Sequence, residues 1–173
     1  MTYRSPVADM LFSLKAVAGL PQLIDGKLDG EFDWATIASV ISEAGRFATE
    51  EIAPLNRAAD TAGAAYENGV VTTPPGFADA YRRWAEAGWG GVSAPAEFGG
   101  MALPHLVNVA CTEIWNGASM AFALCPLLTE GAVHALQASG SPEASIPGIC
   151  KAALGSGRAW MSNLSATSRK ARR

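Results

Sequence analysis

Residues 33–52 have the sequence DWATIASVISEAGRFATEEI, and this stretch decides the fold class. Its apolar side chains recur every three or four residues, at Ile37, Val40, Ile41, Ala44, Ala48 and Ile52. That spacing places them on one face of an α-helix. Asp33, directly before the pattern, is a typical N-cap residue, and Pro54 is expected to close the helix. We therefore predict one long amphipathic helix here.

A shorter helix is predicted before it, over residues 7–18. Ser5 and Pro6 have the pattern of an N-cap followed by proline in the first turn. Gly19 and Pro21 are expected to end this helix. The pairs Asp25-Gly26 and Asp29-Gly30 then indicate turns before the long helix begins.

Three more helices are predicted after the long one, over residues 75–87, 104–116 and 119–138. Pro126 lies inside the last of these and should kink or divide it, and Gly140 with Pro142 should end it. The segment between the long helix and residue 76 is expected to be a connection with a turn at Asn68-Gly69. An extended piece at residues 70–73 has no evident partner strand. Together these patterns predict an all-α fold, a helical bundle without internal repeats.

Charge is distributed unevenly along the chain. All 16 Asp and Glu lie at or before Glu143, whereas residues 144–173 contain six of the 13 Lys and Arg. An acidic body is a poor match to nucleic acid, which is bound through clustered basic side chains. Residues 144–173 also lack a sustained period, so we expect an irregular basic tail that is disordered or of unrelated sequence.

The cysteines and the apolar runs indicate the compartment. Three widely spaced cysteines without a C-x-x-C motif indicate neither a disulfide framework nor a zinc knuckle, and they fit a reducing environment. The longest apolar run is far below the roughly 20 residues that span a bilayer, and the first residues lack the apolar core of a signal peptide. We expect a cytoplasmic protein with neither a nucleic-acid nor a membrane partner.

No group of residues in the sequence indicates a reaction. His105 and His134 fall in separate predicted helices, and we find no carboxylate at a ligand-like offset from either. Cys111 and Cys125 lie on apolar helical stretches, where a buried cysteine is usually a small apolar side chain. Composition and periodicity thus predict no catalytic, cofactor-binding or metal-ligating residue.

Several segments, taken in order, resemble one family of enzymes. Residues 3–10 resemble the start of a subgroup of acyl-CoA dehydrogenases, the 3-methylmercaptopropionyl-CoA dehydrogenase-like enzymes, which have an extra amino-terminal segment. Residues 47–56 are similar to the family's first long helix, and residues 89–100 to the loop before its next helix pair. The remaining matches are Glu113 and residues 119–122, 128–132 and 139–143.

The resemblance implies an amino-terminal helical domain of a FAD-dependent enzyme that desaturates an acyl-CoA thioester between its α and β carbons. In this family a glutamate removes the α-proton and the flavin accepts the β-hydrogen as hydride. Helices of the first domain form part of the wall around the acyl chain. The tentative wall residues in this sequence are Met120, Phe122, Pro126, Leu127 and Leu128.

The resemblance ends after Glu143. Neither the segment that opens the flavin-binding β-domain nor the catalytic glutamate has a counterpart in residues 145–173. We expect a truncated or frame-shifted gene product, or a fragment with an unrelated end, that neither binds FAD nor turns over alone. The expected divisions are an extension helix at 1–30, the family domain at 31–143 and the basic tail at 144–173.

An alternative of a different class stays open. The chain would then be a non-catalytic helical module that associates with a partner, either a second copy of itself or a separate chain that supplies the missing domains. Apolar surface left uncovered by those domains would drive the association.

Overall fold

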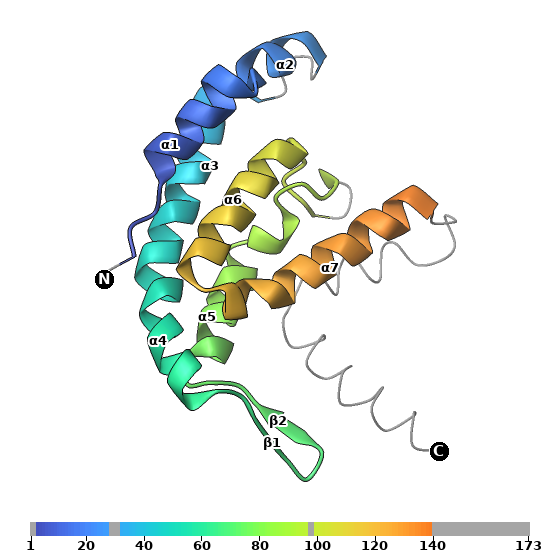
Figure 1. Ribbon diagram of the computed structural model, residues 1–173. Coiled ribbons are helices and arrows are strands. Elements are labelled where there is room, and N and C mark those ends of the chain that lie inside the picture. Colours follow the sequence, from blue (N-terminus) through green and yellow to red (C-terminus); the bar gives the residue numbers. More distant parts are fainter. Residues whose placement is uncertain (1–2, 28–31, 97–98, 140–173) are drawn as a thin grey trace.

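Helices dominate the residues that the structure describes, namely 3–27, 32–96 and 99–139, in a computed structural model (Figure 1). In chain order the elements are α1 (Val7–Phe12), the π-helical turn η1 (Ser13–Val17), α2 (Leu20–Lys27), α3 (Trp34–Phe47), the π-helical turn η2 (Ala48–Ile52), α4 (Ala53–Ala62), β1 (Ala65–Glu67), β2 (Val70–Thr72), α5 (Phe77–Glu86), the 3-10 turn η3 (Trp89–Gly91), α6 (His105–Ala118) and α7 (Met120–Ser139). The predicted all-α fold class is confirmed.

The predicted long helix forms α3, and the chain stays helical through η2 into α4 (Figure 1). Asp33 caps it as predicted, because its Oδ1 accepts a hydrogen bond of 2.7 Å from the backbone N–H of Thr36. The prediction that Pro54 closes the helix is wrong. Pro54 instead lies in the first turn of α4, directly after the π-helical turn, where its missing N–H is not needed. The helical path therefore continues to Ala62 instead of becoming a long connection.

The amino-terminal segment contains two helices rather than the predicted one. Gly19 ends the first helical run with φ 62°, but Pro21 then lies in the first turn of α2. The predicted turn at Asp25-Gly26 is wrong because both residues belong to α2, whereas Asp29-Gly30 lies outside the described residues. The predicted cap is also wrong: Pro6 precedes α1, and no side chain caps this helix.

The amino-terminal helices pack onto the core of the bundle. Leu14, Leu20 and Ile24 are buried in the same cluster as the apolar face of α3. Gly45 of α3 allows the close approach, since a Cβ built there would lie 2.3 Å from Cγ2 of Val7. These contacts make residues 3–27 part of the packed structure.

A small hairpin follows α4 and extends away from the bundle (Figure 1). β1 pairs antiparallel with β2, so the extended piece predicted at residues 70–73 has the partner strand that the sequence left unidentified. Asn68 and Gly69 join the strands with φ 49° and 82°, the positive values of a two-residue type I′ turn. All side chains of both strands are exposed, so the hairpin adds nothing to the core.

The chain between α5 and α6 folds back on itself. The N–H of Met101 donates to the carbonyl of Gly91 at 2.8 Å, and the N–H of Leu103 donates to the carbonyl of Val92 at 2.9 Å. Gly100 is required at this crossing, because a Cβ there would lie 2.1 Å from the carbonyl oxygen of Ala94. These contacts bring residues 99–103 back onto residues 91–94.

Helix α6 packs against α3 on one side and α7 on the other. Ser119 separates α6 from α7 by its extended backbone, and its buried Oγ accepts the N–H of Phe122. Of the kink or division predicted at Pro126, the division is wrong, since α7 continues through this residue. Within the described residues, no helix is long and apolar enough to cross a membrane. The predicted stop at Gly140 and Pro142 and the basic tail at 144–173 lie outside these residues.

Candidate functional site

An open cleft lies where α6, α7 and the folded loop after α5 meet. It is shallow: the room it offers to solvent is about 30 Å³, and the space between its lining atoms is about 460 Å³ only when the open solvent at its mouth is counted. The loop supplies Gly90, Ser93 and Ala94, held in place by the backbone hydrogen bonds of the crossing at Gly100. The site is therefore built on α6 and α7, on Trp84 of α5 and on one hydrogen-bonded loop.

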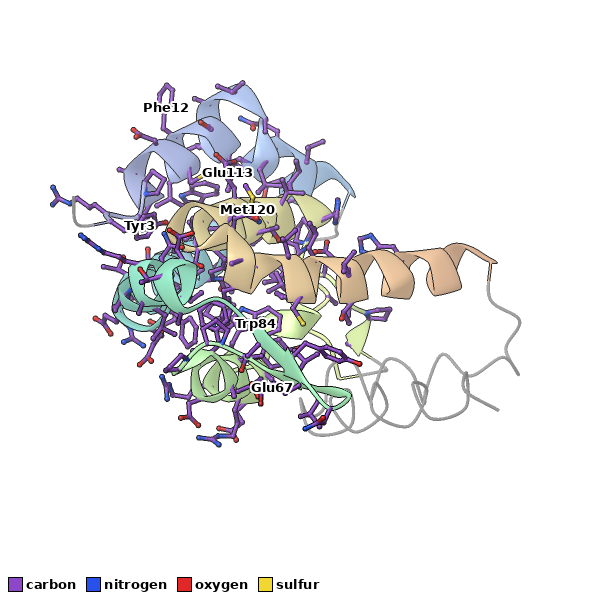
Figure 2. The ribbon with its side chains drawn as sticks, turned by 60° about the horizontal axis from the view of Figure 1, so that its bottom comes forward. Tyr3, Phe12, Glu67, Trp84, Glu113 and Met120 are labelled. Atoms are coloured by element: carbon purple, nitrogen blue, oxygen red, sulfur yellow. The ribbon has the colours of Figure 1, made fainter. Side chains whose placement is uncertain are left out.

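Three tryptophans form the floor of the cleft. Trp115 contacts Trp84 and Trp89 edge to face, with ring centroids 5.3 and 5.5 Å apart. Figure 2 shows Trp84 in the interior of the bundle. The indole N–H groups of all three are buried and have no hydrogen-bond partner within the described part of the chain. The floor is thus an apolar surface that keeps three unused hydrogen-bond donors.

Helix α7 supplies one side of the cleft. All five predicted wall residues belong to this helix, and two of them line the cleft. Pro126 and Leu127 both line the cleft, together with Ala123 one turn earlier. Pro126 is buried, whereas 41% of Leu127 is exposed, so its side chain is accessible from the cleft.

The other three predicted wall residues lie elsewhere. Phe122 is 3% exposed and packs in the core, where its ring meets that of Phe77 edge to face at 5.8 Å. Met120 and Leu128 are 63% and 69% exposed and do not line the cleft, and Figure 2 shows Met120 at the start of α7. Helical rotation explains the difference, because each residue turns the side chain by about 100° and only some positions of residues 120–128 face the cleft.

Burial holds Tyr81 of α5, Cys111 of α6 and Cys125 of α7 in their protonated forms. Burial raises the pKa of Tyr81 to about 12, and the neighbouring Cys125 thiol adds to this shift. Burial also raises the pKa of the Cys125 thiol and brings that of Cys111 to about 12. A thiol of this kind is a poor nucleophile near neutral pH, so we assign these cysteines a packing role.

The cleft ends at a group of polar side chains that the sequence analysis did not bring together. His105 of α6 and His134 of α7 lie with ring centroids 4.9 Å apart, and Glu130 lies between them and Asn108. The expectation that no carboxylate lies at a ligand-like offset from either histidine is wrong, because Glu130 precedes His134 by four residues, which places both on one helix face. The proximity of His105 depends on how α6 packs against α7.

Comparison with known proteins agrees with this architecture. The family model for the acyl-CoA dehydrogenase N-terminal domain matches residues 37–145. The 3-methylmercaptopropionyl-CoA dehydrogenase of Ruegeria pomeroyi (strain ATCC 700808 / DSM 15171 / DSS-3) is 45% identical over 141 residues. That alignment covers 82% of this chain and 24% of the Ruegeria enzyme.

The helical bundle is thus an acyl-CoA dehydrogenase N-terminal domain, and the chain belongs to the acyl-CoA dehydrogenase family. Its similarity to a 3-methylmercaptopropionyl-CoA dehydrogenase confirms the resemblance drawn from residues 3–143. The chain spans about a quarter of the length of this relative, with 24% covered.

Proposed function

We propose that this chain provides the amino-terminal helical domain of an acyl-CoA dehydrogenase and that its cleft forms part of the wall around an acyl chain. One observation carries the second half of the proposal: Pro126 and Leu127 line an open cleft whose floor is aromatic. An apolar cleft with a few polar groups at its edge is the usual form of a small-molecule site. The domain itself would extend over residues 31–143, with 1–30 as an amino-terminal extension packed onto it.

The residues described do not by themselves fit FAD, which the family generally uses. FAD has a pyrophosphate, which proteins bind through basic side chains or through clustered backbone N–H groups at a helix N-terminus. The lining of the cleft contains neither Lys nor Arg. We therefore assign no flavin contact and no catalytic base to the described residues, and turnover would require further domains.

Tryptophan fluorescence tests the cleft directly, because Trp84, Trp89 and Trp115 line it. Titration of the chain with butanoyl-CoA and octanoyl-CoA should change the emission in a saturable way, with tighter binding for the longer acyl group. Each buried CH₂ group stabilises the complex by about 0.8 kcal/mol, so the longer acyl chain of octanoyl-CoA should bind more tightly than that of butanoyl-CoA. Free CoA is the control ligand and should change the emission less.

Leu127 and Leu128 form a matched pair of variants, since they are adjacent leucines and only the first lines the cleft. Leu127→Ala should weaken binding of octanoyl-CoA by about five-fold, because it removes about 1 kcal/mol of apolar contact. Leu128→Ala should leave binding unchanged. Equal effects of the two variants, or equal responses to CoA and octanoyl-CoA, would contradict an acyl-binding cleft.

A second candidate function is supported by an exposed apolar stripe on α7. It comprises Met120, Leu124, Leu127 and Leu128, which share one helix face and are all exposed. A surface of this kind drives association in water. We propose that it contacts either a second copy of this chain or the remaining domains of the enzyme.

A further inference from the structure

We propose that His105, Glu130 and His134 form a binding site for a divalent transition-metal ion of the zinc type, at the edge of the cleft. Each of these three residues offers one ligand atom, and the three atoms lie within 4.8 Å of one another. The site combines one residue from α6 with two from α7, so it depends on the packing of the two helices. It lies at the polar edge of the same cleft, which Glu130 and His134 also line, but it does not depend on the proposed enzyme function.

The ligand set fits this class of ion. Two imidazole nitrogens and one carboxylate oxygen are typical zinc ligands, and they also suit other first-row ions such as Co²⁺ and Ni²⁺. Magnesium and calcium ions prefer sites made only of oxygen atoms. The site should therefore discriminate between these two groups of ions.

One pair of ligand atoms already lies near the spacing that a bound ion would impose. Nδ1 of His105 and Oε1 of Glu130 lie 3.9 Å apart, too far for a hydrogen bond. Two ligands of a tetrahedral zinc ion lie about 3.4 Å apart, since each is about 2.1 Å from the metal. A small side-chain rotation closes this difference, and the 58% exposed side chain of His105 has room for it.

The surroundings hold the carboxylate in place. Glu130 and His134 are four residues apart on α7, a spacing that places two ligands on one helix face. The side-chain amide of the buried Asn108 donates to Oε1 of Glu130. Such a hydrogen bond orients a metal-binding carboxylate. Within the described residues, neither Lys nor Arg forms a salt bridge with Glu130, so its charge is available to a cation.

Isothermal titration of the 173-residue chain with Zn²⁺, after removal of any histidine tag, tests the site. We expect one zinc ion to bind per chain, with no binding of Mg²⁺ under the same conditions. His105 and His134 are the only two histidines of the sequence, so Zn²⁺ should shift the imidazole NMR signals of both. A signal of either histidine that stays in place would overturn the three-residue site.

The variant His105→Ala should lower zinc affinity by about 100-fold or more, given that loss of a supporting residue alone typically costs 10- to 100-fold. It should fold normally because the side chain is largely exposed. Glu113→Gln, an exposed site on the same helix, is the matched control and should bind zinc like the unaltered chain. Equal affinity of His105→Ala and Glu113→Gln, or no binding by the unaltered chain, would overturn the proposal.

Binding through thiols is the remaining alternative, and cobalt distinguishes it. The visible spectrum of the Co²⁺ complex should show ligation by nitrogen and oxygen without thiolate charge-transfer bands. Strong thiolate bands, lost in Cys125→Ser, would show that the metal binds to cysteine and would overturn the assignment.

Discussion

At the scale of single residues, Gly45 determines how closely the amino-terminal segment approaches α3. The variant Gly45→Ala should lower the free energy of unfolding by about 1–3 kcal/mol, because the added methyl group overlaps Val7 and Ser5 in a packed interface. Urea unfolding followed by circular dichroism measures the change. An unchanged midpoint would show that residues 5–7 are not packed against Gly45.

Gly131 of α7 is the matched control for this substitution. It is also helical, but a Cβ built there meets no atom within 4 Å. Gly131→Ala should therefore raise the stability by about 0.5–1 kcal/mol, the usual advantage of alanine over glycine in a helix. If both variants lose stability to the same extent, steric overlap at Gly45 is not the cause.

Cys111 couples the stability of the protein to alkaline pH. Burial raises the pKa of this thiol from 9.0 to about 12 in the folded protein. The thiol therefore ionises first in the unfolded chain, and its contribution to stability is complete below pH 9.0 and is lost as the pH rises toward 12.

The free energy of unfolding should fall by about 1.4 kcal/mol per pH unit for this group above its unfolded pKa. Urea unfolding between about pH 8 and about pH 10 would measure the slope. Tyr81 and Cys125, whose pKa values are also raised, contribute in the same direction. Cys111→Ala should make the slope shallower, and identical slopes in the two proteins would contradict the assignment.

At the scale of single elements, the β-hairpin is independent of the helical core. Gly69 has φ 82°, which a β-branched residue adopts only with strain of about 1–2 kcal/mol. Gly69→Val should therefore open the hairpin while the thermal midpoint of the helical bundle stays within about 2 °C, because no side chain of the strands is buried. Amide hydrogen exchange of Ala65 to Thr72 and thermal circular dichroism measure the two effects. If the hairpin amides lose protection and the thermal midpoint of the bundle also falls, the hairpin supports the core.

Pro54 was expected to end the long helix, and its place in the first turn of α4 has a local physical cause. Proline normally ends a helix because it lacks the N–H and its ring clashes with the preceding turn. The π-helical turn η2 widens the backbone directly before Pro54, so the proline begins a new regular helix. The residues between Ala48 and Ile52 carry no composition signal that distinguishes a π turn from an α turn.

At the scale of the whole molecule, the apolar stripe of α7 should control association. Size-exclusion chromatography with light scattering should detect dimers or larger species of the unaltered chain, and Leu124→Lys with Leu128→Lys should shift the protein toward monomer. The matched control is Val70→Lys with Val71→Lys, which adds the same charge on the exposed hairpin. A monomeric unaltered chain would contradict self-association through the stripe and leave the remaining domains of the enzyme as its proposed partner. An equal effect of the two double variants would contradict the role of the stripe in association.

The candidate site was only partly predictable. Of the five expected wall residues, Pro126 and Leu127 line this cleft and Met120, Phe122 and Leu128 do not, because the rotation of α7 turns only some of its positions toward the cleft. The meeting of His105 with Glu130 and His134 was missed. A linear pattern contains the spacing within one helix, whereas proximity between two helices depends on their packing.

Local and periodic features of this protein follow from its amino-acid order: the helical class, the cap at Asp33, the turn at Asn68-Gly69 and the family. These features depend on contacts between residues a few positions apart, and such contacts are present in the sequence pattern itself. The cleft, its tryptophan floor and the histidine–glutamate group required the folded chain. They join α5, α6, α7 and a loop, and only the packing of buried side chains sets the distances and rotations between those elements.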